Sequence, residues 1–314
     1  MLITWRPVSG GAELVCVRTP DADITLPETI AGLPVTAVGQ YAFSPVCEQA
    51  QGEQLNITCG ISEDVPDNRA LACVTLPPTL RRLDDYAFYN CAGLRVLRFF
   101  EPITHWGTGI FMNCRLMDTL VIHAADEEAQ SVYRLVSDFS RELDITVLYP
   151  QGEQARLIFP GYAEVYSENI SARHLDYSIN GAGFPYHNMF RSRALVIKDY
   201  DRLWPGLTAR AHDRDCALRI AWYRLSYPYG LTKEAEQLYL EYLNRHAGDV
   251  ILWRITERDI SGLAWFLHKA ELSRQILSNA CAEARSQKSP EALALLLEEQ
   301  HIRFGGTEKT TFTL

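Results

Sequence analysis

"VTLPPTLRRLDDYAFYNC", residues 74–91, decides how this chain folds, because its parts recur along the sequence. The stretch passes from a short β-like run through a Pro-Pro break into an aromatic segment that ends in Asn-Cys. Proline supplies no N–H and therefore stops a strand, while Tyr86 and Phe88 are expected to fill the interior on the return path. One such unit cannot bury its apolar face alone, so copies of it must stack.

The recurrence has a period of 23 residues. An L-x-x-L-x-L pattern begins at Leu71 in "LACVTL", and the same apolar pattern begins at Leu94 in "LRVLRF" and at Met117 in "MDTLVI", each 23 residues after the last. The Asn-Cys pairs that end at Cys91 and Cys114 keep this spacing. Two independent anchors therefore predict a solenoid of stacked strands and return loops, in which the Asn-Cys pair is structural.

Weaker copies flank this region. "ITLPETIAGLPVTAVGQYAF" (24–43) repeats the Thr-Leu-Pro opening and the Tyr-Ala-Phe close. "QLNITCG" (54–60) indicates a further strand in a polar insertion, and "DITVLYP" (144–150) indicates a terminal cap. At the N-terminus, "LITW" and "ELVCV" predict a capping hairpin around Gly10-Gly11, because the exposed first strand of a solenoid must be covered.

With these segments and "GIFMNC", the region from Ile24 to Ile122 resembles the BspA-like bacterial leucine-rich repeat family. The resemblance implies a β-solenoid with a concave sheet and no shared catalytic residues. Family members are commonly surface or secreted adhesins. The N-terminal "MLITWRPVSGGAELVCV" lacks the basic segment and apolar core of a signal peptide, so we expect a cytoplasmic protein. A surface adhesin exported without a recognisable signal peptide is an alternative.

The residues between the buried strand positions should line the concave face of the sheet. They form three lateral rows, namely Cys73, Val96 and Thr119; Thr75, Arg98 and Val121; and Pro77, Phe100 and His123. The rows are mildly apolar with one cation and one imidazole, which is typical of a protein-binding surface. The alternative to a binding surface is that these rows form a face that is merely exposed to solvent or that contacts another domain of the same chain.

Beyond Pro150 the repeat is lost, and a turn-rich, aromatic stretch (157–193) indicates a connector packed on the solenoid end. Its "NGAGFPYHN" lacks both the G-x-G-x-x-G spacing and the Lys-Ser/Thr of phosphate loops. Gly181 and Gly183 favour a turn, since glycine tolerates positive φ. The alternative is a ligand-contacting loop, formed by Tyr186, His187, Phe190 and Arg191.

From residue 200 onward, helical spacing dominates. Two helical stripes are predicted: Ala217, Ile220, Ala221 and Leu225; then Ala235, Leu238, Tyr239 and Tyr242. Thr232 is expected to cap the second helix and Gly248 to end it.

Two later segments, "ISGLAWFLHKA" and "SPEALALLLEEQ", resemble each other at a spacing of 30 residues. The alignment pairs Leu263 with Leu293 and Leu267 with Leu297. It predicts stacked helical hairpins with a weak resemblance to ankyrin-type repeats.

Composition limits the partners. The 314 residues are 47% hydrophobic and carry 30 Lys and Arg against 39 Asp and Glu, a net charge of -9. Nucleic acid is therefore not expected as a partner, and no stretch is apolar enough for membrane insertion. The eight cysteines include no C-x-x-C pair, so we expect free buried thiols rather than a zinc ribbon.

No recognised catalytic spacing stands out. H-E-x-x-H, G-x-S-x-G and P-loop patterns are absent, while "HDRD" (212–215) and "DYDRLW" (199–204) are typical of helix entries. We therefore predict a non-enzymatic protein-protein interaction module or scaffold that uses the concave face and the helical array, has a protein partner and needs no cofactor. The alternative from another class is a hydrolase or transferase with a site at the domain junction.

The predicted fold is α+β, an N-terminal leucine-rich-repeat β-solenoid followed by an all-α helical-repeat domain. Its expected boundaries are 1–150 for the solenoid with its capping hairpin, 151–199 for the connector, 200–306 for the helical domain and 307–314 for a flexible tail.

Overall fold

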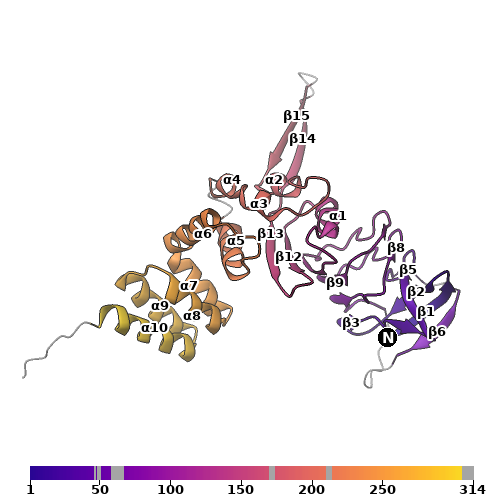
Figure 1. Cartoon of the computed structure of the whole chain (residues 1–314), viewed down its shortest axis with the longest axis horizontal. Helices are drawn as coiled ribbons and strands as arrows, with labels where there is room; N and C mark the ends of the chain where they lie inside the picture. The colour runs from indigo at the N-terminus through magenta and orange to yellow at the C-terminus, as the bar shows by residue number, and fades with distance from the viewer. Residues whose placement is uncertain (46, 48–50, 58–66, 170–173, 210–213, 306–314) are drawn as a thin grey trace, which may run out of the picture. The chain divides into compact units, whose positions relative to one another are not determined.

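The computed structural model describes residues 1–45, 47, 51–57, 67–169, 174–209 and 214–305. An N-terminal β-solenoid of about five turns is followed by a helical C-terminal region (Figure 1). The chain divides into two compact units. Unit 1 comprises Met1–Asp213 with Tyr227–Gly230, and unit 2 comprises Arg214–Ser226 with Leu231–Leu314.

A six-stranded sheet forms one wall of the solenoid. Its order is β13-β12-β11-β9-β7-β3, with the bounds β3 Asp23–Thr25, β7 Cys73–Thr75, β9 Val96–Phe100, β11 Thr119–His123, β12 Leu143–Leu148 and β13 Gln154–Phe159. All neighbours are parallel except β13, which runs antiparallel to β12. The segment predicted to be a terminal cap is thus a fifth parallel strand, and β13 covers its edge.

A second sheet runs along the return path and includes the N-terminal cap. Its order is β10-β8-β5-β2-β1-β6, with β4 paired to β5; the bounds are β1 Leu2–Val8, β2 Gly11–Arg18, β4 Thr29–Ile30, β5 Leu33–Val38, β6 Glu53–Asn56, β8 Arg82–Leu83 and β10 His105–Trp106. The predicted capping hairpin is confirmed, and Gly10 takes a positive φ of 85° at its turn. β6 pairs with β1, so the strand predicted in the polar insertion belongs to the cap.

A column of phenylalanine rings fills the solenoid interior. Phe88 lies between Phe43 and Phe111, at ring-centroid distances of 4.5 and 5.6 Å. Phe139 continues the column 6.0 Å from Phe111. Each coil supplies one ring, so every coil buries its aromatic side chain against the next coil.

The recurring Asn-Cys pair holds consecutive coils together. The buried thiols of Cys91 and Cys114 donate to the carbonyl oxygens of Phe43 and Phe88, at 3.4 and 3.1 Å. Burial raises the pKa of both thiols, that of Cys114 to about 12, so they stay protonated. The preceding Asn90 adopts a left-handed φ of 62°, which asparagine tolerates better than most residues.

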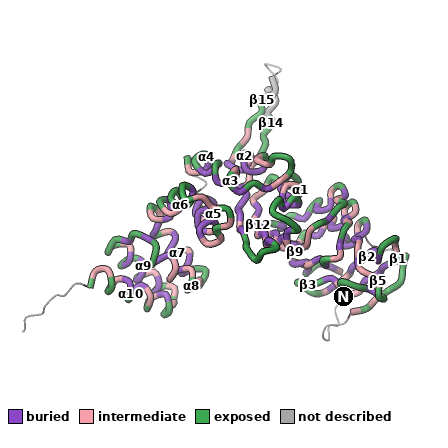
Figure 2. Tube along the Cα trace, viewed as in Figure 1, coloured by how far each residue is buried: buried purple, intermediate pink, exposed green. Residues whose placement is uncertain are grey.

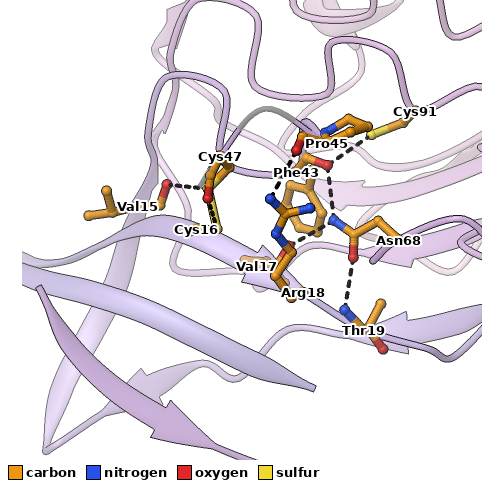
Figure 3. The surroundings of a disulfide bond; sticks show 10 residues. All are labelled: Val15, Cys16, Val17, Arg18, Thr19, Phe43, Pro45, Cys47, Asn68 and Cys91. Atoms are coloured by element: carbon orange, nitrogen blue, oxygen red, sulfur yellow. Dashed lines mark hydrogen bonds between the residues drawn. A yellow bond between two sulfur atoms is a disulfide. The ribbon is translucent and has the colours of Figure 1, made fainter. Parts of the chain in front are cut away.

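Contrary to the expectation of free thiols throughout, Cys16 and Cys47 form a disulfide, with their Cα atoms 5.9 Å apart (Figure 3). The sequence separation of 31 residues offers no pattern that predicts this contact. The expectation holds for the other described cysteines, which are free and buried: Cys73, Cys91, Cys114, Cys216 and Cys281. Cys59 lies outside the described residues.

A buried amide near the disulfide ties the N-terminal hairpin to the first coil (Figure 3). The Asn68 Nδ2 donates to the carbonyl oxygens of Val17 and Phe43, at 2.8 and 2.9 Å. Its Oδ1 accepts from the Thr19 N–H at 2.8 Å. One side chain therefore satisfies three buried backbone groups.

The rest of unit 1 surrounds the last coil. It contains the helices α1 Gln130–Asp138, α2 Gly183–His187, α3 Ile197–Asp201 and α4 Trp204–Thr208, and the hairpin β14 Ala163–Asn169 with β15 His174–Asn180. The expected turn exists: Gly181 has a φ of 93°. Gly183 is required for a different reason. The backbone packs so closely against the Pro160 carbonyl oxygen that a Cβ at position 183 would lie 1.9 Å from it.

Unit 2 is helical. Its elements are α5 Arg214–Ser226, α6 Lys233–Arg245, α7 Ala247–Thr256, α8 Ile260–Lys269, α9 Arg274–Ser286 and α10 Pro290–Phe304. The stripe predicted in α5 is confirmed, since all four of its residues are buried. The Thr232 cap of α6 is confirmed as well, because its Oγ1 accepts from the Ala235 N–H at 3.3 Å.

Two expectations for α6 are wrong. Leu238 is 45% exposed, because the buried face of α6 contains Ala235, Tyr239 and Tyr242, and Leu238 lies beside this face toward solvent. Gly248 does not end the helix, because α6 ends at Arg245 and Gly248 lies within α7.

Buried positions recur every 30 residues in α5, α7 and α9. The equivalent sets are Ala217, Ala247 and Leu277; Ile220, Val250 and Ala280; and Ala221, Ile251 and Cys281. The turns before α8 and α10 keep the same spacing, since Arg258 and Lys288 have positive φ values of 55° and 54°. The predicted alignment of α8 with α10 keeps this spacing, but burial does not follow it throughout: Leu267 is buried, whereas Leu297 is 44% exposed and Leu296 is buried instead.

The two equivalent helix starts at Asp259 and Ser289 differ in chemistry. The Asp259 Oδ1 accepts from the Gly262 N–H at 2.8 Å, and its Oδ2 lies 3.0 Å from Nη1 of the buried Arg254. Ser289 makes no side-chain cap to α10. The first position is thus both a helix cap and the partner of a buried cation.

We predict that Asp259→Ala lowers the free energy of unfolding of unit 2 by about 2–3 kcal/mol, because it removes a cap and leaves Arg254 without its carboxylate. The matched change Ser289→Ala should cost less than about 0.5 kcal/mol. Urea denaturation followed by circular dichroism measures both. Equal losses for the two variants would contradict this account of the cap.

Candidate binding surface

The side of the six-stranded sheet that faces away from the phenylalanine column carries the predicted binding residues. Burial alternates along β9 and β11: Leu97 and Leu120 are fully buried, whereas Val96 and Thr119 are half-buried on the other side. We call this side the open face, formed by Thr75, Val96, Arg98, Phe100, Thr119, Val121, His123, Asp144, Thr146 and Leu148. Strand alternation therefore places these side chains together.

The lateral rows have the predicted register. Cys73 pairs with Val96, which pairs with Thr119. Thr75, Arg98 and Val121 form the second row, and Phe100 pairs with His123 in the third. Pro77 does not join the third row: β7 ends at Thr75, because proline cannot continue the ladder, and Pro77 is buried.

Ion pairs lie on both sides of the apolar centre of the open face. The Arg98 Nη1 lies 3.8 Å from Asp23 Oδ2 and also contacts the Cys73 sulfur. On the other side, Arg156 of β13 donates two hydrogen bonds to the Asp144 carboxylate, from Nε to Oδ1 at 2.9 Å and from Nη2 to Oδ2 at 2.6 Å. Val121 of β11 lies between the two pairs in the sheet order, whereas Val96 shares β9 with Arg98 and lies in the lateral row that runs from Asp144 to Asp23.

An aromatic pair forms the third row. The His123 ring stacks on Phe100 with its centroid 4.0 Å away and the ring planes 17° apart. Burial lowers the pKa of His123 below its ordinary value, so the imidazole is neutral at pH 7. The pair therefore offers a flat, uncharged surface beside a guanidinium.

Cys73 does not provide a reactive thiolate. Burial and a hydrogen bond with Asp23 raise its pKa to about 11, and they outweigh the nearby Arg98, which lowers it. A protonated thiol is a poor nucleophile and a poor metal ligand. Among the described residues, no group of three or more His, Cys, Asp or Glu side chains could hold a metal ion.

The structure separates the residues of the proposed ligand-contacting loop. Tyr186 is only 1% exposed and packs edge-on against Tyr200, so it has no surface for a ligand. Phe190 stacks on Phe159 at 6.0 Å. Arg191 is exposed, with Nε 3.4 Å from Asp199 Oδ2. Phe190 thus packs the connector against the solenoid end, because Phe159 belongs to β13.

His187 is buried between two backbone carbonyls. Its Nδ1 lies 3.1 Å from the Val136 oxygen and its Nε2 lies 2.9 Å from the Pro160 oxygen. Burial lowers the pKa of His187, although the carbonyl contacts act in the opposite direction. The neutral ring has a single N–H, so it donates either to the Val136 carbonyl of α1 or to the Pro160 carbonyl after β13.

Sequence reasoning missed Asp23, Asp144 and Arg156. The alternating pattern of "DITVLYP" could have placed Asp144 on the open face, because β12 continues the rows and Asp144 pairs with Thr119. Arg156 lies on an antiparallel strand outside the repeat, so its place on the sheet leaves no trace in the 23-residue spacing.

Unit 2 carries a separate pocket of about 380 Å³ between α5 and α7. Its lining combines both charges with apolar walls: Arg214, Asp215, Leu218, Arg219, Asp249, Leu252, Trp253 and Thr256. The Arg214 Nη1 lies 3.5 Å from Asp249 Oδ2 at its edge. The volume suits a small ligand or a few side chains of a partner.

Comparison with known proteins found no matching family model, no matching curated protein and no matching solved structure. None of the described helices combines the length and apolarity that crossing a membrane requires.

We predict that His187 makes the fold less stable on acidification. Its pKa is lowered in the folded state, so the unfolded chain takes up a proton first, and stability falls as the pH drops below about 6.5. His187→Gln should reduce the loss of unfolding free energy between about pH 7.5 and about pH 5.5. The exposed His268→Gln serves as control and should leave the loss unchanged. Denaturant titrations at both pH values test this, and identical pH profiles for wild type and His187→Gln would refute it.

Proposed function

We propose that this protein is a non-enzymatic protein-protein interaction module or scaffold whose partner binds the open face of the solenoid. The observation that carries the proposal is the row arrangement. Val121 lies between the Arg98–Asp23 and Arg156–Asp144 pairs, Val96 lies in the row that runs from Asp144 to Asp23, and the Phe100–His123 stack lies beside them. Protein interfaces combine an apolar centre with aromatic and arginine anchors and a polar rim.

The geometry favours a protein over a small substrate. The open face extends across four parallel strands, and its side chains are half-buried side by side on a sheet. Its charges are already paired, so a partner gains specificity by matching the pairs and affinity by covering the apolar centre. The pocket between α5 and α7 supplies a second surface on unit 2.

We further infer that the coils are leucine-rich repeats of the BspA-like type and that unit 2 is a helical repeat related to ankyrin-type arrays. The 23-residue spacing of the apolar and Asn-Cys anchors supports the first identity. The 30-residue spacing of buried positions in α5, α7 and α9 supports the second. Both arrays present extended surfaces, which suits a scaffold.

We predict that an Arg98→Glu, His123→Glu variant loses its specific partner in an affinity pull-down from native lysate, with binding weakened by about tenfold or more. The carboxylates repel Asp23 and replace the neutral aromatic surface with charge. Arg115→Glu, in the return loop after Cys114, is the matched control and should keep the partner. Mass spectrometry identifies the captured protein, and circular dichroism confirms that both variants fold. A partner that binds both variants equally would exclude the open face.

A second candidate is a binding protein that works in an oxidising compartment, as exported adhesins do. The Cys16–Cys47 disulfide favours it, because disulfides persist outside the reducing cytosol. The candidate differs from the cytoplasmic location expected from the sequence.

We predict for this second candidate that protein isolated from its native cells, with free thiols alkylated at lysis, carries Cys16 and Cys47 as a disulfide-linked peptide pair. Buried Cys91 and Cys114 should be alkylated only after denaturation and provide the control. Peptide mass spectrometry measures both. Recovery of Cys16 and Cys47 as thiols would favour the cytoplasm.

A further inference from the structure

The β14–β15 hairpin pairs with neither of the two large sheets. It forms a two-stranded sheet by itself and extends from the rest of unit 1 (Figure 1). Its base is fixed, because the Tyr162 N–H donates to the Ser140 carbonyl at 2.8 Å and Gly183 packs directly on the Pro160 carbonyl. The described part of the hairpin is therefore an arm held at its base.

The arm exposes large apolar and aromatic side chains to solvent, which is unusual for an isolated hairpin. Tyr166 is 62% exposed, Tyr177 is 49% exposed and Val165 is 40% exposed. Figure 2 shows exposed residues along the described part of the hairpin. The two tyrosines are directly paired across the strands, with ring centroids 5.0 Å apart. A two-stranded sheet is marginal alone in water, and clustered exposed apolar side chains mark interaction sites.

The edges of the arm lack the protection usual for exposed strands. Natural edge strands are blocked by lysine, proline or a bulge. The sequences of β14 ("AEVYSEN") and β15 ("HLDYSIN") contain neither lysine nor proline, and their pairing runs without a register shift; their charged residues include two glutamates in β14 and one aspartate in β15. Among the described residues, no strand pairs with the outer edge of either one.

We propose that the outer edge of β15 pairs antiparallel with β15 of a second copy of this chain, about a two-fold axis at Ser178. Such an isologous contact requires that the strand be complementary to itself. With the axis at Ser178, Tyr177 of each copy lies opposite Ile179 of the other copy. Aromatic and β-branched residues are a favourable cross-strand pair, and the symmetry makes this pair twice.

The same register extends an apolar row across three strands, and the row ends at Glu164 of the second copy on the fourth strand. Tyr166 already lies opposite Tyr177, so the row continues from Tyr166 through Tyr177 to Ile179 of the second copy. The hydroxyl of Tyr166 keeps its hydrogen bond to the Glu164 carboxylate, 3.0 Å away on the same strand. Pairing through β14 would instead place Glu164 within the row, since Glu164 lies opposite Ile179. The geometry therefore favours β15 as the shared edge.

Two measurements on the full chain test the proposal. Size-exclusion chromatography with light scattering should show a concentration-dependent dimer, and Tyr177→Lys, Ile179→Lys should weaken its dissociation constant by about tenfold or more. The control is Val165→Lys, which adds one lysine to the opposite face of the hairpin and should leave the dimer intact. Thermal melting should show that the variants fold.

Cross-linking locates the axis. Ser178→Cys places two thiols opposite each other at the two-fold axis, so mild oxidation should produce a covalent dimer on a non-reducing gel. In Val165→Cys the two thiols lie three strand spacings apart, roughly 14 Å, and should not join. The proposal is overturned by a monomer at every concentration, by a dimer that Tyr177→Lys, Ile179→Lys leaves unchanged, or by a Val165→Cys cross-link stronger than that of Ser178→Cys.

Discussion

The structure of unit 1 depends on one constraint, which is that no coil of 23 residues can satisfy its own backbone or bury its own apolar face. Each coil therefore takes its hydrogen bonds and its aromatic contacts from the coil beside it. Phe88 shows how closely the two needs are linked. Its ring stacks between Phe43 and Phe111, its N–H donates to the Ile110 carbonyl at 2.9 Å, and its own carbonyl accepts the Cys114 thiol. A change in the spacing would break all three contacts at once.

The same constraint explains the two ends of the solenoid. A stack of coils ends in a strand with a free edge, which favours association with other chains. At the start, the β1–β2 hairpin covers the return-path sheet through β2, and the Asn68 amide and the Cys16–Cys47 disulfide fasten it to the first coil. At the far end, β13 turns back antiparallel along β12. Caps of two different designs thus solve one problem of edge protection.

The sequence predicted what depends on spacing and failed where contacts join segments without a common period. The rows of the open face were correct except at Pro77, because strand alternation and a fixed repeat determine which side chains are neighbours. The Arg156–Asp144 pair was missed, since β13 runs against the repeat. The disulfide was missed because a separation of 31 residues matches neither repeat. The 30-residue alignment of Leu267 with Leu297 did not reveal which leucine of α10 is buried, because each residue turns the helix by about 100° and a small rotation brings Leu296 inward instead.

Unit 2 shows how a repeat can lose an interaction without instability. In α7 the buried Arg254 guanidinium lies 3.3 Å from the Trp253 ring centroid and 3.0 Å from the Asp259 carboxylate. Thirty residues later, Ala284 replaces the arginine and Ser289 replaces the aspartate. Loss of either partner alone would leave a buried charge or a carboxylate without its cation, which costs more than loss of both. The two positions do not always change together, since thirty residues before Arg254 the buried Arg224 keeps the arginine although Tyr229 stands at the aspartate position. In α9, Ala284 fills the space as a buried apolar residue.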